Sequence, residues 1–487
     1  MKTSCCGRQE VVNSRREFLT KSAFGFGGVA LTYLLDKEAA FGAVFPNTRT
    51  PTGQDTLVPR APHFPAKAKS VIFIFMQGGM SHVDTFDPKP ELVRFDGQPL
   101  PPSFNTGELK LQFISAAQAK LMSSRFQFKK RQQSGIEISE LFAELSQHAD
   151  DLAVIRSCYH DSFIHGPALN MLYTGSVLVG HPSVGSWVLY GLGSETDRLP
   201  AFMVMTDGSI SGRSSSSYQS GFLPALYQGT LVRTEGSPIM NLAPPSQIDQ
   251  GEQRMILDQL GDWNREYLQS RADDTRLAAR IANYELAFRM QMAAPELIDI
   301  SKESPKVTEM YGIGKEPTDK FGRMCLLARR MVERDVRFVQ LISTDWDGHS
   351  ECGKNHLENA HKIDKPIAGL IADLKQRGML DSTLIVSSGE FGRTPVMQGN
   401  EGRDHSPYGF SVWLAGGGIR GGKVIGATDE LGFRAVEDKV HAHDLHATML
   451  SLLGLDHRKL TYLFLGREQR LTDVGGQNDL SQRLLGA

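Results

Sequence analysis

The run Ser70-Val71-Ile72-Phe73-Ile74-Phe75-Met76 decides the fold class, because every residue after the first is large and apolar. A continuous apolar run of this length is typical of a strand that is buried on both faces, as in a parallel sheet. The segment Gln77-Gly78-Gly79-Met80-Ser81-His82-Val83-Asp84 follows directly, and its glycines and polar residues predict a loop. We therefore expect order to begin with a buried strand that ends in a polar loop.

Strand and helix patterns alternate from this strand to the carboxyl end. Apolar runs predict further strands at 152–155, 336–342, 384–386 and 410–414. Apolar residues at helical spacing predict helices at 138–145, 324–332, 363–374 and 445–453. Such alternation is typical of an α/β protein with a mostly parallel sheet and helices on both faces. Residues 85–135 and 207–317 lack buried-strand patterns, so we expect them to be insertions that cap the active face.

The composition is that of an ordinary globular protein. The 487 residues are 40% hydrophobic and 22% charged, with a net charge of −2. A near-neutral chain gives no electrostatic reason to expect a nucleic acid or an anionic membrane as partner. Cys158, Cys325 and Cys352 follow the amino-terminal segment and form no Cys-x-x-Cys pair, so we expect neither a disulfide framework nor a thiolate zinc site.

The amino terminus has the layout of an export signal. Ser14-Arg15-Arg16-Glu17-Phe18-Leu19 precedes a weakly apolar run at 23–35 and several small residues. The paired arginines resemble a twin-arginine signal, so we expect a signal peptide at 1–43 and a periplasmic or otherwise exported protein. The run is shorter than the roughly 20 residues of a membrane span, and an uncleaved anchor or a surface helix is the alternative. We expect a proline-rich linker at 44–69 and one domain without a membrane span at 70–487.

Residues with ligand chemistry gather where the predicted strands end. Ligands of an open parallel sheet bind beyond the carboxyl ends of its strands. The candidate metal ligands near these positions are Asp84, Asp345, Asp347, His349, Glu390, Asp404 and His405. Carboxylates and imidazoles suit zinc, manganese, magnesium or calcium, so their convergence on one sheet edge predicts a divalent metal site. Taken singly, each of these residues also fits a capped turn.

Longer motifs at the same places resemble a known family. They are Gly78-Gly79-Met80-Ser81-His82-Val83-Asp84-Thr85-Phe86-Asp87-Pro88, Trp346-Asp347-Gly348-His349, Glu390-Phe391-Gly392-Arg393-Thr394-Pro395, Gly402-Arg403-Asp404-His405 and Asp444-Leu445-His446-Ala447-Thr448. From about residue 70 almost to the end, the chain is similar to the bacterial family of domain of unknown function 1501, which is grouped with alkaline phosphatases and sulfatases. The resemblance implies a three-layer α/β/α sandwich with metal ions at the strand ends. It also implies hydrolysis of a phosphate or sulfate ester, carried by an anionic small molecule or a glycan.

The resemblance implies ligand roles for residues after two of the strands. Asp347 and His349 match the Asp/His contribution after a central strand, and Asp345 is the alternative to Asp347. His405, with Asp404 beside it, matches the late histidine of the superfamily. These residues are therefore expected to hold the metal.

Other positions depart from the superfamily pattern. Glu390 matches the acidic half of an Asp-His pair, but Phe391 stands in place of the histidine. Asp84 would replace the acidic ligand that normally ends the first strand. Arg393 and Arg403 are expected to steady an anionic substrate, because guanidinium groups suit phosphate and sulfate oxygens. Surface ion pairing is the other interpretation of the two arginines.

The nucleophile of the superfamily has no obvious counterpart. The resemblance places it shortly before Thr174-Gly175, where the sulfatase spacing lands on His165. His165 would act as a nucleophile, or as a ligand of a metal whose hydroxide attacks directly, or it belongs to a site that binds without turnover. Two functions follow: an exported metal-dependent hydrolase of phosphate or sulfate esters, and a non-catalytic periplasmic binding protein on the same scaffold.

Two further motifs have simpler interpretations. Gly416-Gly417-Gly418 lacks the Gly-Lys-Ser/Thr of a phosphate-binding loop, so nucleotide binding is not expected. His441, His443 and His446 flank the start of a predicted helix, where Asp444 is expected to cap backbone amides rather than to join a metal site.

Overall fold

The computed structural model describes residues 57–101, 120–208, 212–233, 249–269 and 275–486. The predicted signal at 1–43 lies outside these residues, and the predicted linker at 44–69 is described only from residue 57. Residues 57–69 contain no helix or strand and are hydrogen-bonded to the domain, for example from Ala68 N to Leu452 O.

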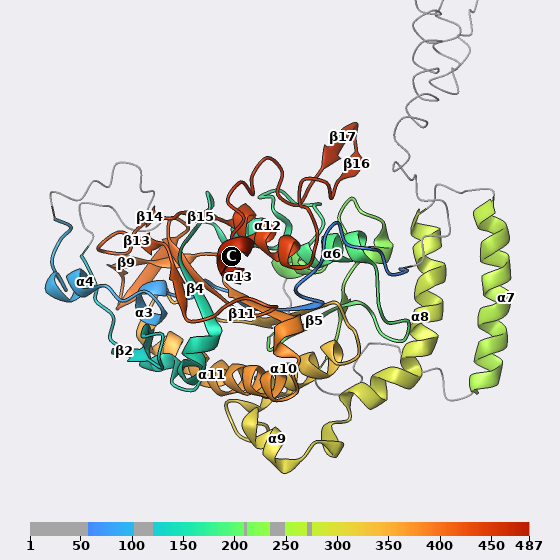
Figure 1. Ribbon diagram of the computed structural model, residues 1–487, viewed down its shortest axis with the longest axis horizontal. Helices are drawn as coiled ribbons and strands as arrows, with labels where there is room; N and C mark the ends of the chain where they lie inside the picture. Colours follow the sequence, from blue (N-terminus) through green and yellow to red (C-terminus); the bar gives the residue numbers. More distant parts are fainter. Residues whose placement is uncertain (1–56, 102–119, 209–211, 234–248, 270–274, 487) are drawn as a thin grey trace, which may run out of the picture. The chain divides into compact units, whose positions relative to one another are not determined.

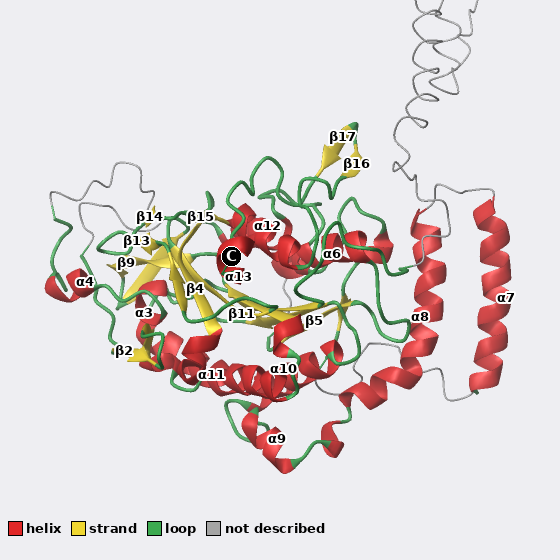
Figure 2. Cartoon of the chain, viewed as in Figure 1, coloured by secondary structure: helices red, strands yellow, loops and turns green. Residues whose placement is uncertain are grey.

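A central sheet of nine strands organises the chain (Figures 1 and 2). Its order is β12 (Lys423–Ile425), β4 (Leu152–Tyr159), β11 (Phe410–Gly416), β8 (Thr383–Ser388), β1 (Ser70–Met76), β7 (Phe338–Ser343), β5 (Phe202–Thr206) and β6 (Thr230–Leu231), with β15 (Val440–His441) paired to β4. Strand β1 is parallel to both β7 and β8, and β5 is parallel to β7. Only β11 runs against its neighbours β8 and β4 within this sheet. The predicted mostly parallel sheet is confirmed.

The two faces of the sheet are covered by separate hydrophobic cores. Val71, Phe73 and Phe75 of β1 belong to one core, and Ile72 and Ile74 belong to the other. The first core is covered by α5 (His165–Thr174), α6 (Val184–Leu192) and α12 (Ala442–Leu452), and the second by α10 (Asp319–Val332) and α11 (Cys352–Gln376). Figure 1 shows α10 and α11 on one side of the sheet and α6 and α12 on the other. The continuous apolar run of β1 is thus explained, because both sides of the strand are buried.

The remaining described elements lie outside these layers. The first predicted insertion carries α4 (Pro90–Arg94) and β2 (Phe128–Arg131), which pairs with β3 (Ile136–Ser139); α3 (His82–Thr85) precedes it. The second carries α7 (Gln250–Gln269), α8 (Thr275–Ile298) and α9 (Pro305–Met310). Two small hairpins, β13 (Ala427–Thr428) with β14 (Ala435–Glu437) and β16 (Tyr462–Phe464) with β17 (Arg467–Gln469), and the short helix α13 (Ser481–Leu485) lie near the carboxyl end of the chain. Within the described residues, no helix has the length and apolar character needed to cross a membrane.

Several features differ from the sequence-based expectation. The predicted helix at 138–145 is wrong, because these residues form the end of β3 and short 3-10 helices. Strand β5 has no recognised pattern, although its residues Phe202–Thr206 are largely buried next to β7. Strand β6 lies inside the second predicted insertion but extends the central sheet. The antiparallel hairpin of β9 (Gly392–Gln398) and β10 (Gly402–Ser406) was not recognised as a pair of strands. This hairpin matters most, because it carries part of the candidate site.

Candidate metal centre

Four side chains from separate parts of the chain meet beyond the carboxyl edge of the sheet. His165 is the first residue of α5, after β4; Asp347 and His349 lie in the loop after β7; His405 lies on β10. One ligand atom of each residue lies within 4.8 Å of the ligand atoms of the other three. The structure therefore brings together three of the predicted ligands and His165.

The distances between these atoms suit a coordination shell. His349 Nε2 lies 2.9 Å from His405 Nε2 and 3.1 Å from Asp347 Oδ1. His165 Nε2 lies 3.2 Å from Asp347 Oδ2, and His405 Nε2 lies 3.4 Å from Asp347 Oδ1. Ligands at roughly 2.0–2.1 Å from a tetrahedral zinc ion are about 3.3–3.4 Å apart. His165 Nε2 is also buried, and the Asp347 carboxylate is the partner that it faces. These residues fit a divalent metal.

Each of the three imidazoles is held from its far side by an acceptor. The acceptors at the Nδ1 atoms are Glu390 Oε1 at 2.8 Å from His165, Gln398 Oε1 at 2.6 Å from His349 and Phe163 O at 2.8 Å from His405. An acceptor at Nδ1 keeps a hydrogen on that nitrogen, so the lone pair of a neutral imidazole is on Nε2. All three rings are thus oriented to present Nε2 to one point.

A layer of buried charges fixes the positions of the ligands. Glu390 is fully buried, and its two oxygens accept the Gly78 N–H at 2.9 and 3.0 Å. Arg393 is also fully buried; it donates to Asp347 Oδ1 at 2.5 Å and to three backbone carbonyl groups. Gly78 has a φ of +120°, and an added Cβ would lie 2.5 Å from the backbone nitrogen of Asp347. The loop after β1 therefore needs glycine to approach the loop after β7 this closely.

The electrostatics of the site are set by the two carboxylates. Burial disfavours a charged His165, but the neighbouring carboxylates of Asp347 and Glu390 outweigh it and raise the pKa of His165 to about 9. The hydrogen bond to Asp347 raises the pKa of His349, whereas burial lowers the pKa of His405. Despite its partial burial, Asp347 has a pKa well below the usual range, because the three histidines and Arg393 surround it. The side chain of Asp347 is 43% exposed, so solvent reaches the cluster at this carboxylate.

Two predicted site residues, Asp84 and Arg403, form a buried ion pair that is separate from the cluster. Arg403 Nε donates to Asp84 Oδ2 at 2.7 Å, and both side chains are buried. The other donors of Arg403 bond to Asp84 Oδ1 and to the carbonyl oxygens of Met122, Ser123 and Thr394. Asp84 therefore does not join the metal ligands, and Arg403 has no free face for an anionic substrate. Instead, the pair joins α3 to β10.

Four other predicted residues also lie differently from the expectation. Asp345 is exposed, and its Oδ2 lies 3.2 Å from Thr344 Oγ1 rather than in the cluster. Asp404 is buried beside the cluster, and its Oδ1 accepts the backbone N–H of His405. Glu390 contacts a candidate ligand instead of being one. Arg393 binds carbonyl groups and Asp347, so its donors are not directed at a substrate.

Three residues that sequence reasoning did not assign support the site. Gln398 and Phe163 provide acceptors for His349 and His405. Phe391 packs its ring against His405, with ring centroids 4.4 Å apart. An apolar ring that contacts a candidate ligand thus takes the position where the superfamily pattern has a histidine. Gln398 follows the recognised motif on β9, but a single glutamine carries no sequence signal for this role.

The later histidines have the structural role that was expected for them. Asp444 Oδ2 accepts the backbone N–H of His441 at 2.9 Å, and the two residues form a capping box at the start of α12. His443 Nε2 and His446 Nε2 contact the carbonyl oxygens of Gly175 and Leu172. These histidines therefore serve the packing of α12 against the end of α5.

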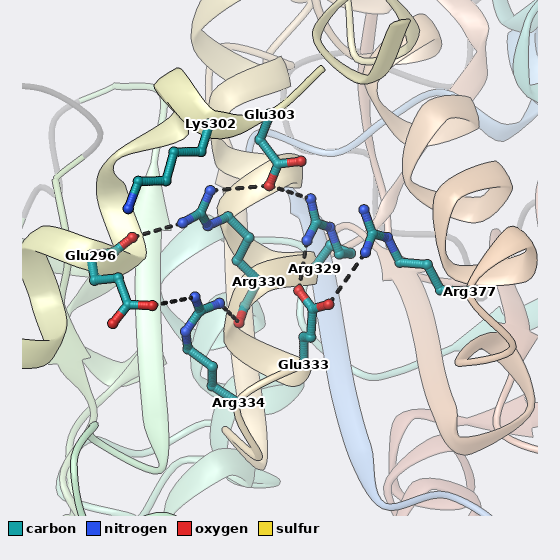
Figure 3. Close-up of a pocket in the computed structure, with 8 residues that line it drawn as sticks. All are labelled: Glu296, Lys302, Glu303, Arg329, Arg330, Glu333, Arg334 and Arg377. Atoms are coloured by element: carbon teal, nitrogen blue, oxygen red, sulfur yellow. Dashed lines mark hydrogen bonds and ion pairs between the residues drawn. The ribbon is translucent and has the colours of Figure 1, made fainter.

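A cavity of about 260 Å³ lies at the carboxyl end of α10 (Figure 3). It is lined by Glu296, Lys302, Glu303, Arg329, Arg330, Glu333, Arg334 and Arg377. Arg329 contacts Glu303 at 2.7 Å and Asp373 at 3.0 Å, so charges of both signs compensate one another. Because the end of α10 leads into the start of β7, this cavity lies at the sheet edge opposite the metal-ligand cluster. We interpret it as an ion-pair network that joins α8, α10 and α11.

The fold and the site define a class: an α/β protein with a His/Asp cluster that could hold a metal ion at the carboxyl edge of a mostly parallel sheet. The chain belongs to the family described as "Protein of unknown function (DUF1501)", whose profile matches residues 68–481. The resemblance drawn from the motifs is thereby confirmed. None of the curated proteins matches the chain.

Solved structures with a related arrangement include several enzymes. The chain is similar to the lipoteichoic acid synthase LtaP from Listeria monocytogenes, with 9% identity, a TM-score of 0.37 and coverage of 87% of this chain and 79% of that one. It is similar to alkaline phosphatase from the Antarctic bacterium TAB5, with 10% identity, a TM-score of 0.28 and coverage of 72% and 92%. For the phosphonate monoester hydrolase from Silicibacter pomeroyi, the identity is 12%, the TM-score 0.31 and the coverage 71% and 72%.

Proposed function

We propose that this protein is an exported, metal-dependent hydrolase of phosphate or sulfate esters. The observation that carries the proposal is the convergence of three imidazole Nε2 atoms and the Asp347 carboxylate, with every imidazole held by an acceptor at Nδ1. A set rich in nitrogen suits zinc or another first-row transition metal better than calcium or magnesium, which take oxygen ligands. The twin-arginine motif at Arg15-Arg16 supports export of the folded, loaded protein.

His165, Asp347, His349 and His405 would hold the ion. When bound, such an ion polarises an ester oxygen and lowers the pKa of water. The chain itself orients the ligands: Glu390 and Gln398 fix two of the rings, and Arg393 fixes Asp347. His165 has to release a proton before its Nε2 can act as a ligand, because its pKa is about 9 in the metal-free protein. Asp347 is the open side of the site, from which an ester would approach.

Metal content of the exported protein tests the proposal. Elemental analysis is expected to find near-stoichiometric metal in the wild type and none in a His349→Ala, His405→Ala variant. His361→Ala is the matched control, because this histidine is exposed on α11, and it should keep its metal. Hydrolysis of aryl phosphate and aryl sulfate should follow the metal content. A wild-type protein without metal would refute the hydrolase assignment.

One observation favours a second function, a non-catalytic binding protein. Four protein ligands complete a tetrahedral shell, which is typical of a structural site, whereas catalytic zinc sites keep one position open. Stoichiometric metal with no turnover of either ester class would support this alternative. The hydrolase requires a fifth coordination position for water or substrate, which would have to open at the exposed carboxylate of Asp347.

A further inference from the structure

Two turns that are far apart in the sequence each expose three consecutive apolar residues. After α5, Leu178 is 65% and Val179 is 83% exposed, and Val177 precedes them. In the turn of the β16–β17 hairpin, Leu463 is 61% and Leu465 is 89% exposed, with Phe464 between them. Single exposed apolar residues are ordinary, but two exposed triplets are an exception for a protein surface.

The two turns lie next to each other. The ring of Phe222 stacks on that of Phe464, with centroids 4.9 Å apart and planes at 17°. The residue before it, Gly221, is packed against the backbone of Gly180 and His181, because a Cβ added there would lie 2.4–2.6 Å from their atoms. Phe222 therefore connects the end of the first turn with the hairpin. We call residues 177–179 and 463–465 the apolar tips.

The apolar tips are held outward by ordered structure. The hairpin has regular antiparallel pairing from Tyr462 to Gln469, and Tyr462 also packs against Tyr190 at 5.7 Å between centroids. In the first turn, Asn170 Nδ2 donates to Val177 O and Ser176 Oγ accepts the N–H of Leu178. The exposed side chains are thus presented to solvent by a fixed backbone and do not fold back into the core.

We propose that the apolar tips dock this protein onto a phospholipid surface. Figure 1 shows the β16–β17 hairpin projecting from the body of the domain, where its tip can reach a surface outside the protein. Residues 176–183 and 462–466 contain no charged side chain, whereas two ion pairs, Lys459 with Asp456 and Arg467 with Asp473, flank the hairpin tip. Apolar tips with aromatic rings behind them and charged groups only at their base match the layering of a lipid interface, in which polar groups lie outside the apolar phase. A fluid lipid phase also adapts to two separate tips, as a rigid partner does not.

The inference is independent of the proposed hydrolase activity, although it has a consequence for the site. His165 and the first apolar tip lie at opposite ends of α5, a helix of 10 residues. A helix of this length spans about 15 Å. Docking would therefore hold the metal-ligand cluster close to the lipid surface.

Vesicle flotation tests the inference with the full chain. Vesicles of phosphatidylcholine, with and without phosphatidylglycerol, are expected to carry the wild-type protein to the top of the gradient. The variant with Leu178→Asp and Leu465→Asp should lose at least tenfold in vesicle-bound protein. Met255→Asp is the matched control, because Met255 of α7 is also 65% exposed but lies away from the tips, and it should bind as the wild type does.

Three outcomes would overturn the inference. The first is a wild-type protein that stays at the bottom of the gradient. The second is a tip variant that floats as well as the wild type, which is expected if the apolar run at 23–35 alone binds the vesicles. The third is a wild-type dimer that fails to float and becomes a monomer in the tip variant, which would make the tips a contact between copies. An unchanged melting temperature and metal content of the tip variant show that the change is confined to the surface.

Discussion

Glu390→Gln tests the central argument about the metal centre, because it changes one charge and hardly any volume. The Glu390 side chain is fully buried and contacts His165 Nδ1 at 2.8 Å. Both of its oxygens also accept the Gly78 N–H. Glutamine keeps one oxygen as acceptor, but its NH₂ group replaces the second oxygen and faces an N–H donor. The charge that makes His165 a more basic ligand is lost.

The expected loss of metal affinity is 10- to 100-fold. Removal of an outer-shell partner of a ligating histidine has effects of about this size. The range corresponds to about 1.4–2.7 kcal/mol of binding free energy. A larger effect is not expected, since His349, His405 and Asp347 keep their own partners. In the metal-free protein the same change should lower the pKa of His165, because one of the two carboxylates that raise it becomes neutral.

Competition with a chromophoric chelator measures the affinity for zinc at fixed pH, and NMR titration of the imidazole signals measures the pKa. Glu266→Gln is the control, because Glu266 is an exposed residue of α7. Its affinity should equal that of the wild type. An affinity of Glu390→Gln within threefold of the wild type, in a variant that unfolds at the same temperature, would refute the role of Glu390 as the support of a metal ligand.

Two further predictions concern stability. Arg403→Met leaves the buried carboxylate of Asp84 without its partner, so the free energy of unfolding in urea should fall by about 3–5 kcal/mol. A loss below 1 kcal/mol would contradict the assigned ion pair. His356 and His446 are buried, and burial lowers their pKa values to about 4 and about 3. Below about pH 6.5 the unfolded chain binds protons that the folded protein excludes, so stability must fall as the pH falls. Between pH 7 and pH 5 each histidine should cost about 2 kcal/mol, measured by urea unfolding of the metal-free protein. A flat pH dependence that His446→Gln does not alter would contradict this assignment.

The layered fold could be predicted because its strands are buried on both faces. Such strands leave continuous apolar runs, and β1, β7 and β8 were recognised from them. Strand β5 was missed although it pairs with β7, because Phe202–Thr206 is only five residues long and contains two methionines and a threonine. The β9–β10 hairpin was missed for another reason. Its strands carry arginine, aspartate and histidine in buried positions, and polar residues do not show a strand's apolar pattern.

The residue types of the candidate site could be predicted, but which of these residues gather in the cluster and which support it could not. Parallel strands end at one edge, which brings Asp347, His349 and Glu390 near one another. Whether a carboxylate contacts a metal or an imidazole depends on differences of about 3 Å, the length of one hydrogen bond. Glu390 contacts His165 Nδ1. Spacing along the chain cannot distinguish the two arrangements. For the same reason it could not show that Asp84 pairs with Arg403 and does not join the cluster.

The charges around the cluster explain how an anionic ester could bind although Arg393 and Arg403 are both engaged. Among the side chains that contact the imidazole rings or Asp347, with the imidazoles neutral and Asp404 left out because it bonds to the His405 backbone, Asp347 and Glu390 contribute two negative charges and Arg393 one positive charge, which leaves one negative charge. In the metal-free protein the proton on His165 cancels it, consistent with a pKa of about 9. A divalent ion that displaces this proton makes the same group of side chains positive by one charge. In the proposed hydrolase, the loaded ion would therefore supply the attraction for phosphate or sulfate, and the buried arginines would be needed only to hold the carboxylate and the loops in place.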